Sequence, residues 1–263
     1  MTTTADTRRS EITEILERER YLKVADLQQR FGVSHMSIRR DLTHLEEQGL
    51  LRRVHGGLIA TPFLRLGLEI SPKLAAQTQD GWLEKEEIAQ AAAALVQPGE
   101  ALIFDSGILS YLTACALPGD VLVEGDLTVI TNSLPVALEL APWQGVETIL
   151  LGGEYQANGM MDLSGPSTLR SLEGLHADKM FLTVQAIEIS HGVTVPSEQA
   201  ALSQKMIAAC ADVVLLAARC KIGQVGQVQI LPTSAVRTLI TVPAAPEEFV
   251  SYLIDQGTDV ILA

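Results

Sequence analysis

Three short turns in the second half of the sequence hold the side chains best suited to binding a small anion. Each follows an apolar run and is rich in glycine, hydroxyl or amide groups: Asp105-Ser106-Gly107, Thr131-Asn132-Ser133 and Gly152-Gly153. Small residues let a ligand approach the backbone, and free N–H groups at a following helix start favour an anion such as phosphate. Strand ends use the same residues simply to turn, so one turn alone decides little, but three in succession favour a pocket.

A run of small polar residues followed by two arginines, from Ser34 to Arg40, indicates a different chemistry near the N-terminus. The planar guanidinium of arginine can bridge guanine O6 and N7 or bind a phosphate. Residues 1–65 hold 11 of the 19 Lys and Arg residues but only 9 of the 32 acidic ones. Residues 1–65 are therefore slightly basic, although the whole chain has a formal net charge of −13. Such a concentration of basic residues in one segment is typical of a part that binds nucleic acid.

The apolar spacing predicts that helices position these arginines. We expect an amphipathic helix over residues 8–18, an extended break over residues 21–24 and a second helix over residues 25–30. Gly32 suits the position just past a helix end. Ser34 suits the cap of the next helix, because its hydroxyl can accept a free backbone N–H. Two helices joined by such a turn predict a helix-turn-helix.

The helix after Ser34 would carry the recognition surface. Ile38, Leu42 and Leu45 are four and three residues apart and define its inner face. The N-terminal part of such a helix reaches base edges in the major groove. The DNA contacts that we predict on it are Ser34, His35, Met36, Ser37, Arg39, Arg40, Thr43 and His44.

Gly49 ends this helix, and residues 50–59 predict a strand, a glycine turn and a returning strand. A small hairpin with arginines beside its tip is a wing. Wings contact the DNA backbone or the minor groove, whose negative potential attracts arginine. We therefore add Arg52, Arg53 and His55 to the predicted DNA contacts.

The rest of the chain alternates short apolar runs with helical stretches, which predicts an α/β domain with a mostly parallel sheet. Strands are expected over residues 101–104, 129–131, 148–151, 180–184, 213–216, 236–241 and 259–262. Helices are expected over residues 83–96, 134–140, 167–173, 198–209 and 247–256. We divide the chain into a winged helix-turn-helix domain over residues 1–60, a linker over residues 61–81 and an effector-sensing domain over residues 82–263.

Composition excludes several classes of protein. A content of 47% hydrophobic and 19% charged residues is that of an ordinary globular chain. No apolar run approaches the ~20 residues of a membrane span, and the N-terminus lacks the apolar core of a secretory signal, so we expect a cytoplasmic protein without a membrane partner. Three scattered cysteines and five dispersed histidines show no metal-ligand spacing. We expect no metal, no cofactor and no catalytic residue.

Residues 8–57 resemble the N-terminal domain of the DeoR (deoxyribonucleoside-repressor) family, with Ser37 where the family usually has threonine. The matching residues are Val33-Ser34, Ser37-Ile38-Arg39-Arg40-Asp41-Leu42, Leu45, Gly49, Leu51, Arg53 and His55-Gly56-Gly57. The resemblance implies docking on double-stranded operator DNA, with repression more often than activation.

The second half resembles the DeoR sensor domain, which is similar in fold to ribose-5-phosphate isomerase. The matching stretches are Thr131-Asn132-Ser133, Leu150-Leu151-Gly152-Gly153, Ala177-Asp178-Lys179-Met180-Phe181, Gly192-Val193-Thr194 and Lys221-Ile222-Gly223. The resemblance implies a pocket for a sugar phosphate or a related effector. The predicted effector-binding residues are Asp105, Ser106, Gly107, Thr131, Asn132, Ser133, Gly152, Gly153, Asp178 and Lys221.

The sequence departs from the family pattern at this pocket. Ile108 and Leu109 follow the first turn, where the family has hydroxyl side chains. Residues 218–220 before Lys221 lack the usual acidic residue, and Val242-Pro243 stand where an aspartate is common. The resemblance therefore implies the fold but not the identity of the effector, and a less polar effector, a different anionic group or a lost ligand all remain open.

We expect a DNA-binding regulator that acts as a homodimer or homotetramer, because paired half-sites match paired recognition helices. Two alternatives remain. One is an effector-independent DNA-binding protein with a vestigial pocket. The other is a sugar-phosphate isomerase-like enzyme using Asp105, Asp178 and Lys221, although no sequence spacing brings these residues together.

Overall fold

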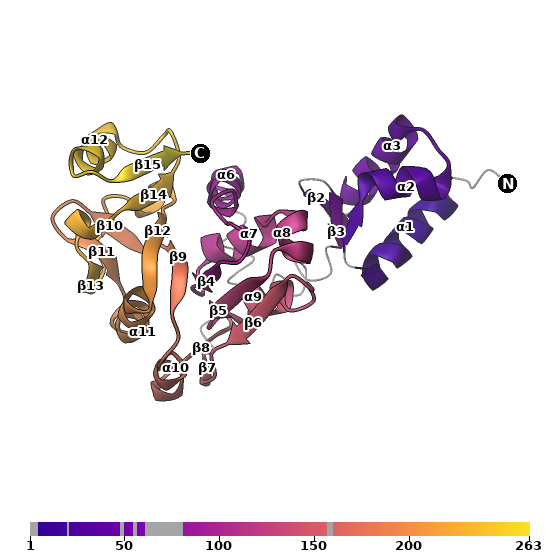
Figure 1. The fold of residues 1–263 in the computed structure, drawn as a ribbon. Coiled ribbons are helices and arrows are strands. Elements are labelled where there is room, and N and C mark those ends of the chain that lie inside the picture. Colours follow the sequence, from indigo (N-terminus) through magenta and orange to yellow (C-terminus); the bar gives the residue numbers. More distant parts are fainter. Residues whose placement is uncertain (1–4, 20, 48–49, 55–56, 61–80, 157–159) are drawn as a thin grey trace.

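The computed structural model describes residues 5–19, 21–47, 50–54, 57–60, 81–156 and 160–263 (Figure 1). The linker predicted over residues 61–81 lies outside the described residues except for its last one.

The N-terminal part is a three-helix unit with a small antiparallel sheet. Its elements are α1 (Ala5–Glu19), β1 (Tyr21–Lys23), α2 (Val24–Phe31), α3 (His35–Glu47), β2 (Leu51–Val54) and β3 (Gly57–Ala60). Apolar side chains from all three helices and from β2 and β3 form one core, which includes Ile12, Leu27, Ile38, Leu51 and Leu58. This core is separate from the two cores that later residues of the chain form.

The sheet of this unit differs from the prediction in one respect. Residues 21–24 were expected to be only an extended break, but Tyr21–Lys23 forms a strand that pairs antiparallel with β3, giving the order β1-β3-β2. Three residues are too few for a clear alternation of apolar and polar side chains, and only the pairing partner shows that this is a strand. The wing is therefore anchored on both sides of β3.

A seven-stranded sheet forms the centre of the second domain, in the order β15-β14-β12-β9-β4-β5-β6 with every neighbouring pair parallel. Its strands are β4 (Ala101–Phe104), β5 (Leu127–Thr131), β6 (Val146–Leu150), β9 (Ala177–Thr183), β12 (Cys210–Leu216), β14 (Thr238–Thr241) and β15 (Asp259–Leu262). Each overlaps a predicted strand, which confirms the α/β class with a mostly parallel sheet.

Helices cover both faces of this sheet. They are α6 (Trp82–Ala93), α7 (Ile108–Ala116), α8 (Gly119–Glu124), α9 (Leu134–Leu140), α10 (Pro166–Ser171), α11 (Ser197–Ala208) and α12 (Glu247–Asp255). Helices α7 and α8 were not among the predicted helices. Residues 108–115 of α7 are all buried, so the helix has no polar face and shows no helical period in its sequence.

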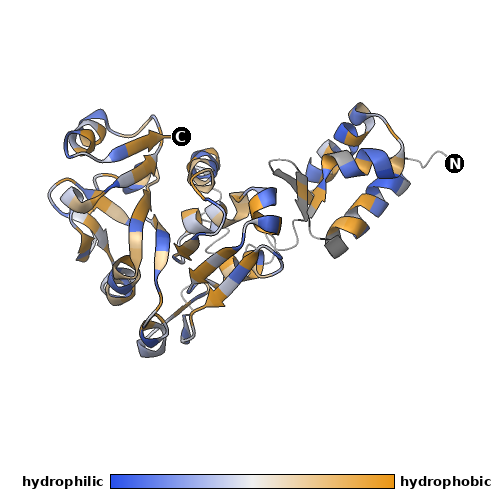
Figure 2. Cartoon of the chain, viewed as in Figure 1, coloured by the Kyte–Doolittle hydropathy of each residue, from blue (hydrophilic) through white to orange (hydrophobic). Residues whose placement is uncertain are grey.

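Successive residues of each strand enter different cores, because side chains alternate across a sheet. Phe104 packs on the side of α6, α7 and α9, where its ring stacks on Phe181 with centroids 5.1 Å apart. Ile103 packs on the opposite side, with α11 and α12. Figure 2 shows the hydrophobic colouring that runs along these strands. Burial on both faces explains why the strands are apolar throughout.

Two smaller sheets flank the carboxyl ends of the large one. A hairpin consists of β7 (Glu154–Gln156) and β8 (Asp162–Ser164), and a three-stranded antiparallel sheet consists of β10 (Ala186–Glu188), β11 (Gly192–Val195) and β13 (Val228–Leu231). Two short 3-10 helices, η1 (Arg219–Lys221) and η2 (Thr233–Ala235), complete the domain. No helix in the described part of the chain combines the length and apolar character that crossing a membrane requires.

Candidate functional site

Helix α3 presents a polar outer face over a buried inner one. Ile38, Leu42 and Leu45 are at most 2% exposed, so the predicted inner face is the one that packs into the core. The helix begins with the predicted cap, in which the backbone N–H of Ser37 donates to Ser34 Oγ over 3.3 Å. The outer residues are exposed at His35, Met36, Arg39, Arg40 and Thr43 and partly buried at Ser37 and His44.

A buried ion pair, which sequence analysis missed, fixes the angle of α3 against α1. Arg8 Nε lies 2.6 Å from Asp41 Oδ2, and Arg9 Nε lies 3.0 Å from Asp41 Oδ1. Asp41 follows the exposed arginines in sequence but lies on the inner side of the helix, where it is 1% exposed. Arg8 and Arg9 precede Asp41 by 33 and 32 residues. Nothing in the local sequence indicates this contact, because it depends on the packing of α1 against α3.

The predicted DNA-contacting residues of the wing lie on its paired strands and in the segment between them. Arg52 and Arg53 lie in β2, paired with Ile59 and Leu58 of β3. Their side chains, together with His55 and Gly49, lie outside the described residues, so their DNA contacts stay predictions.

The second candidate site lies where the order of the parallel sheet reverses. The chain runs outward from β4 through β5 to β6, then returns to β9 on the other side of β4. Ligands of such sheets bind in the crevice at the carboxyl ends of the two strands beside this reversal. Asp105 follows β4 there, and its Oδ2 accepts the backbone N–H of Thr183 at the end of β9, over 3.1 Å.

Asp105 organises the turn beneath this crevice. Its Oδ1 accepts the backbone N–H of Gly107 over 3.0 Å and the hydroxyl of Ser110. Burial raises the pKa of the Asp105 carboxyl from an ordinary value near 3.8 to about 6, because desolvation outweighs the hydrogen bonds from Ser110, Gly107 and Thr183 that lower it. Its hydrogen bonds make Asp105 a structural group of the pocket floor.

A cavity of about 90 Å³ opens above this turn. Of the residues predicted to bind an effector, it is lined by Asp105, Ser106, Gly107 and Asn132. The other lining residues come from the β7–β8 hairpin and its approach, from the loop after β9 and from α11: Gln156, Met160, Asp162, Ser164, Gln185, Glu198, Gln199, Leu202, Ser203 and Met206. The sequence analysis missed these, because the elements that carry them are adjacent only in the folded domain.

A larger and more open pocket of about 510 Å³ adjoins the cavity and shares Gln185 and Glu198 with it. Lys221, the predicted lysine, lines this larger pocket together with Cys220. Lys221 is half-buried at the end of η1. Lys221 therefore lines the larger pocket, whereas Asp105, Ser106, Gly107 and Asn132 line the smaller cavity beside it.

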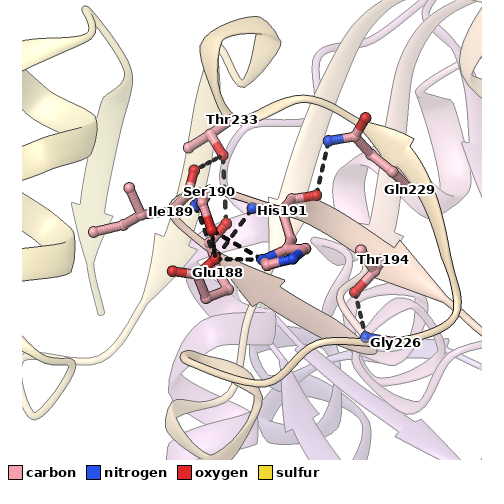
Figure 3. Close-up of polar contacts among 8 residues, drawn as sticks. All are labelled: Glu188, Ile189, Ser190, His191, Thr194, Gly226, Gln229 and Thr233. Atoms are coloured by element: carbon pink, nitrogen blue, oxygen red, sulfur yellow. Dashed lines mark hydrogen bonds and ion pairs between the residues drawn. The ribbon is translucent and has the colours of Figure 1, made fainter.

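The small sheet beside η1 forms one wall of the larger pocket. There the backbone N–H of Gly226 donates to Thr194 Oγ1 over 2.6 Å. Farther along, Glu188 Oε2 accepts the backbone N–H groups of Ser190 and His191 over 2.8 and 3.1 Å (Figure 3). Side-chain bonds from Ser190 and His191 lower the pKa of Glu188 to about 2. This network fixes the β10–β11 turn and so the wall itself.

Several predicted effector residues do not line either pocket. Thr131 Oγ1 donates to the carbonyl of Phe104 over 2.8 Å, and Ser133 Oγ accepts the N–H of Val136 as the cap of α9. Gly152 is exposed after β6, and a Cβ on Gly153 would lie 1.9 Å from Thr168 Oγ1. These side chains and glycines shape the turns without facing the cavity.

Asp178 lies at the other end of the sheet. It is the second residue of β9, and its Oδ2 accepts the backbone N–H of Ala101 at the start of β4, over 2.8 Å. Lys179 beside it pairs with Glu100, Nζ to Oε1 over 2.8 Å. Both contacts fasten the amino ends of β4 and β9, whereas the pocket lies at their carboxyl ends. We therefore correct the prediction and exclude Asp178 from the effector site.

Within the described ranges, no three His, Cys, Asp or Glu side chains lie together in a way that could hold a metal ion.

Both halves of the chain match known families of domains. Residues 82–242 match the DeoR C terminal sensor domain, and residues 8–61 match the DeoR-like helix-turn-helix domain. The chain belongs to the DeoR family. It is a DNA-binding transcriptional regulator rather than an enzyme.

Several named repressors are similar to this chain along most of their length. The transcriptional repressor GlcR of Bacillus subtilis is 31% identical over 231 residues, 88% of this chain and 85% of that protein. The lactose phosphotransferase system repressor of Streptococcus mutans is 33% identical over 239 residues, 89% and 90% of the two chains. Among solved structures, the similarity to ribose 5-phosphate isomerase A from Methanocaldococcus jannaschii covers 54% of this chain and 55% of that chain, at 14% identity and a TM-score of 0.39.

Proposed function

We propose that this regulator represses transcription by placing α3 in the major groove of its operator, and that a small effector bound in the sensor domain changes its DNA affinity. The observation that supports DNA binding by α3 is its exposed polar face, which lies opposite a fully buried apolar face. The relatives that are named as repressors support repression rather than activation.

The contacts we assign to DNA come from the start and outer face of α3 and from the wing. Met36 is 55% exposed, which suits contact with a thymine methyl group. Arg40 projects from the same face and is the residue we assign to a guanine edge or a phosphate. We propose Arg52, Arg53 and His55 for the backbone and minor groove, as wings use them.

The effector site that we propose combines the cavity above Asp105 with the larger pocket beside Lys221. A largely polar cavity at the reversal point of a parallel sheet is where ligands of this fold class bind. Such a site favours an effector-sensing domain over an effector-independent one with a vestigial pocket. Lys221, with three ammonium donors, is the group suited to an effector's anionic end.

Effector binding alters DNA affinity only if it favours one arrangement of the sensor domain over another. We propose that the chain acts as a homodimer or homotetramer in the cytoplasm, where two copies of α3 meet two half-sites. We further propose the division into residues 1–60, 61–81 and 82–263, in which the sensor domains assemble and set the spacing of the two recognition helices.

Selection of tight-binding sequences from a pool of randomised duplex DNA with the full chain tests this function. We expect an enriched sequence with two related half-sites, and release of that duplex by a subset of sugars, polyols and their phosphates. Light scattering of the complex gives the number of chains per duplex. A pool that shows no enrichment over the unselected DNA contradicts the proposed function.

A further inference from the structure

Two buried oxygen atoms in the cavity above Asp105 receive no hydrogen bond from the part of the chain that the structure describes. Asn132 is 2% and Asp162 is 6% exposed, and among the described residues nothing donates to Oδ1 of either side chain. The orientation of the Asn132 amide is fixed, because its Nδ2 donates to the carbonyl of Leu163 over 3.0 Å. Both orphan atoms are acceptors, so a ligand that satisfies them must supply hydrogen-bond donors.

The charge of the cavity points to the same class of ligand. Carboxylates of Asp105, Asp162 and Glu198 line it, and the described part of its wall contains no lysine or arginine. A phosphate dianion brings only acceptor oxygens and a like charge, so it leaves the orphan atoms unsatisfied and is repelled. Hydroxyl groups bring donors without charge.

Two of the backbone N–H groups at the helix start that could hold an anion already donate to protein groups. Gly107 caps α7, but its backbone N–H donates to Asp105 Oδ1, and the N–H of Ser110 donates to Thr183 Oγ1 over 3.1 Å. Ile108 and Leu109, which replace hydroxyl residues here, are 6% and 2% exposed and pack into the core. Neither side chain lines the cavity.

From these contacts we propose that the cavity takes the hydroxyl-bearing end of an unphosphorylated sugar or polyol, whose O–H groups donate to Asn132 Oδ1 and Asp162 Oδ1. The proposal rests on the effector site assigned above and names the class of its ligand. A volume of about 90 Å³ accommodates a short run of CHOH groups, since a single water needs about 10–15 Å³. An effector that also carries an anion places it in the larger pocket, beside Lys221.

Thermal unfolding of the full chain tests this with matched probes: glycerol, D-ribose and D-glucitol, each beside its terminal phosphate ester, and inorganic phosphate alone. We expect at least one unphosphorylated probe to raise the Tm in a saturable way. Inorganic phosphate should not stabilise the protein by binding in this cavity, and it should not compete with that probe.

Asp162→Asn should weaken binding of the stabilising probe about tenfold, since a neutral amide oxygen is a weaker hydrogen-bond acceptor than a carboxylate. Asp120→Asn, the same change on an exposed residue of α8, is the matched control and should leave affinity unchanged. If Asp162→Asn lowers the Tm of the ligand-free protein, Glu198→Gln on the exposed start of α11 replaces it and should weaken the same probe severalfold.

Stabilisation by phosphate esters alone, competition by inorganic phosphate, a response to none of the probes or an unchanged affinity in both cavity variants would overturn the inference. The duplex selected with the same protein separates this failure from failure of the proposed function. A chain that still selects its duplex keeps its role as a regulator and loses only the class of ligand assigned to the cavity.

Discussion

Arg8 and Asp41 form a buried ion pair, with 2.6 Å between Nε and Oδ2, that joins the first helix of the N-terminal domain to its recognition helix. Their side chains are 9% and 2% exposed, so solvent screens the pair little. Arg9 adds a second guanidinium on the other oxygen of the same carboxylate. The direction in which α3 presents its outer face depends on this contact.

Replacing Asp41 should therefore destabilise the DNA-binding domain. Asp41→Ala leaves the buried guanidinium of Arg8 without its carboxylate, which costs about 3 kcal/mol or more, and urea unfolding followed through the N-terminal transition measures it. The double variant Arg8→Met with Asp41→Leu removes both buried charges and should restore most of the stability. Wild-type stability in Asp41→Ala would show that the pair does not hold α3 in place.

Arg40→Ala should weaken binding to the selected duplex. If Arg40 bridges a guanine, about 1–3 kcal/mol of discrimination at one base pair is lost with it. If it binds a phosphate, affinity falls for all sequences and the salt slope decreases by about 1. Titrations at several salt concentrations, with single-base variants of the duplex, separate the two roles. Arg170→Ala in the sensor domain is the control, and wild-type binding by Arg40→Ala would remove this face of α3 from the interface.

Lys221→Ala should leave DNA binding intact and weaken the response to an effector that carries an anionic group. The loss of a charged donor predicts that the dose-response for release of the duplex shifts about tenfold or more. Arg219→Ala removes an exposed cation from the same 3-10 helix and should respond as the wild type does. An unchanged midpoint in Lys221→Ala would exclude this lysine from the site.

Two glycines of the predicted pocket should differ sharply on substitution. A Cβ on Gly107 would lie 2.1 Å from the side chain of Thr183, whereas a Cβ on Gly152 meets nothing closer than 3.8 Å. Gly107→Ala should therefore destabilise the sensor domain by about 1–3 kcal/mol, and Gly152→Ala should stay within about 0.5 kcal/mol of the wild type. Equal unfolding midpoints in the two variants would contradict the close packing of the first turn on β9.

Asp105→Asn should change how sensor-domain stability depends on pH. The pKa of Asp105 is about 6 in the folded protein and near 3.8 without burial, so the folded state binds this proton more tightly. The contribution of protonated Asp105 to the free energy of unfolding is fully present below about pH 3.8 and is lost as the pH rises through about 6. Compared with Asp105→Asn, the wild-type Tm should therefore fall across this window.

Ser110→Ala provides an independent check, because it removes the hydroxyl whose hydrogen bond lowers the pKa of Asp105. The midpoint of the pH-dependent loss of stability should move to a higher pH in this variant. Thermal unfolding of the wild type and both variants between about pH 4 and 7.5 measures the effect. Parallel curves for all three proteins would show that Asp105 does not titrate in this range.

Local patterns determined the parts of this protein that lie within one element. The spacing of Ile38, Leu42 and Leu45 decided which side of α3 faces solvent, because helical periodicity alone fixes the inner face. Continuous apolar runs located all seven strands of the large sheet, since a strand covered on both faces has no polar side. The turns after β4 and β5 followed from these strands, and Asp105, Ser106 and Gly107 of the first turn and Asn132 of the second line the cavity.

Only the tertiary structure decided which distant residues meet. Asp162 and Glu198 complete the wall of the cavity from elements far along the chain, and nothing in their local sequence indicates where β8 and α11 pack. Asp178 was misassigned for the same reason, because its motif does not reveal which end of the sheet it occupies. Among the described residues no donor reaches the buried Oδ1 atoms of Asn132 and Asp162, and this arrangement arises only from packing. The ligand class that we propose rests on it, because a buried acceptor must be matched by a donor.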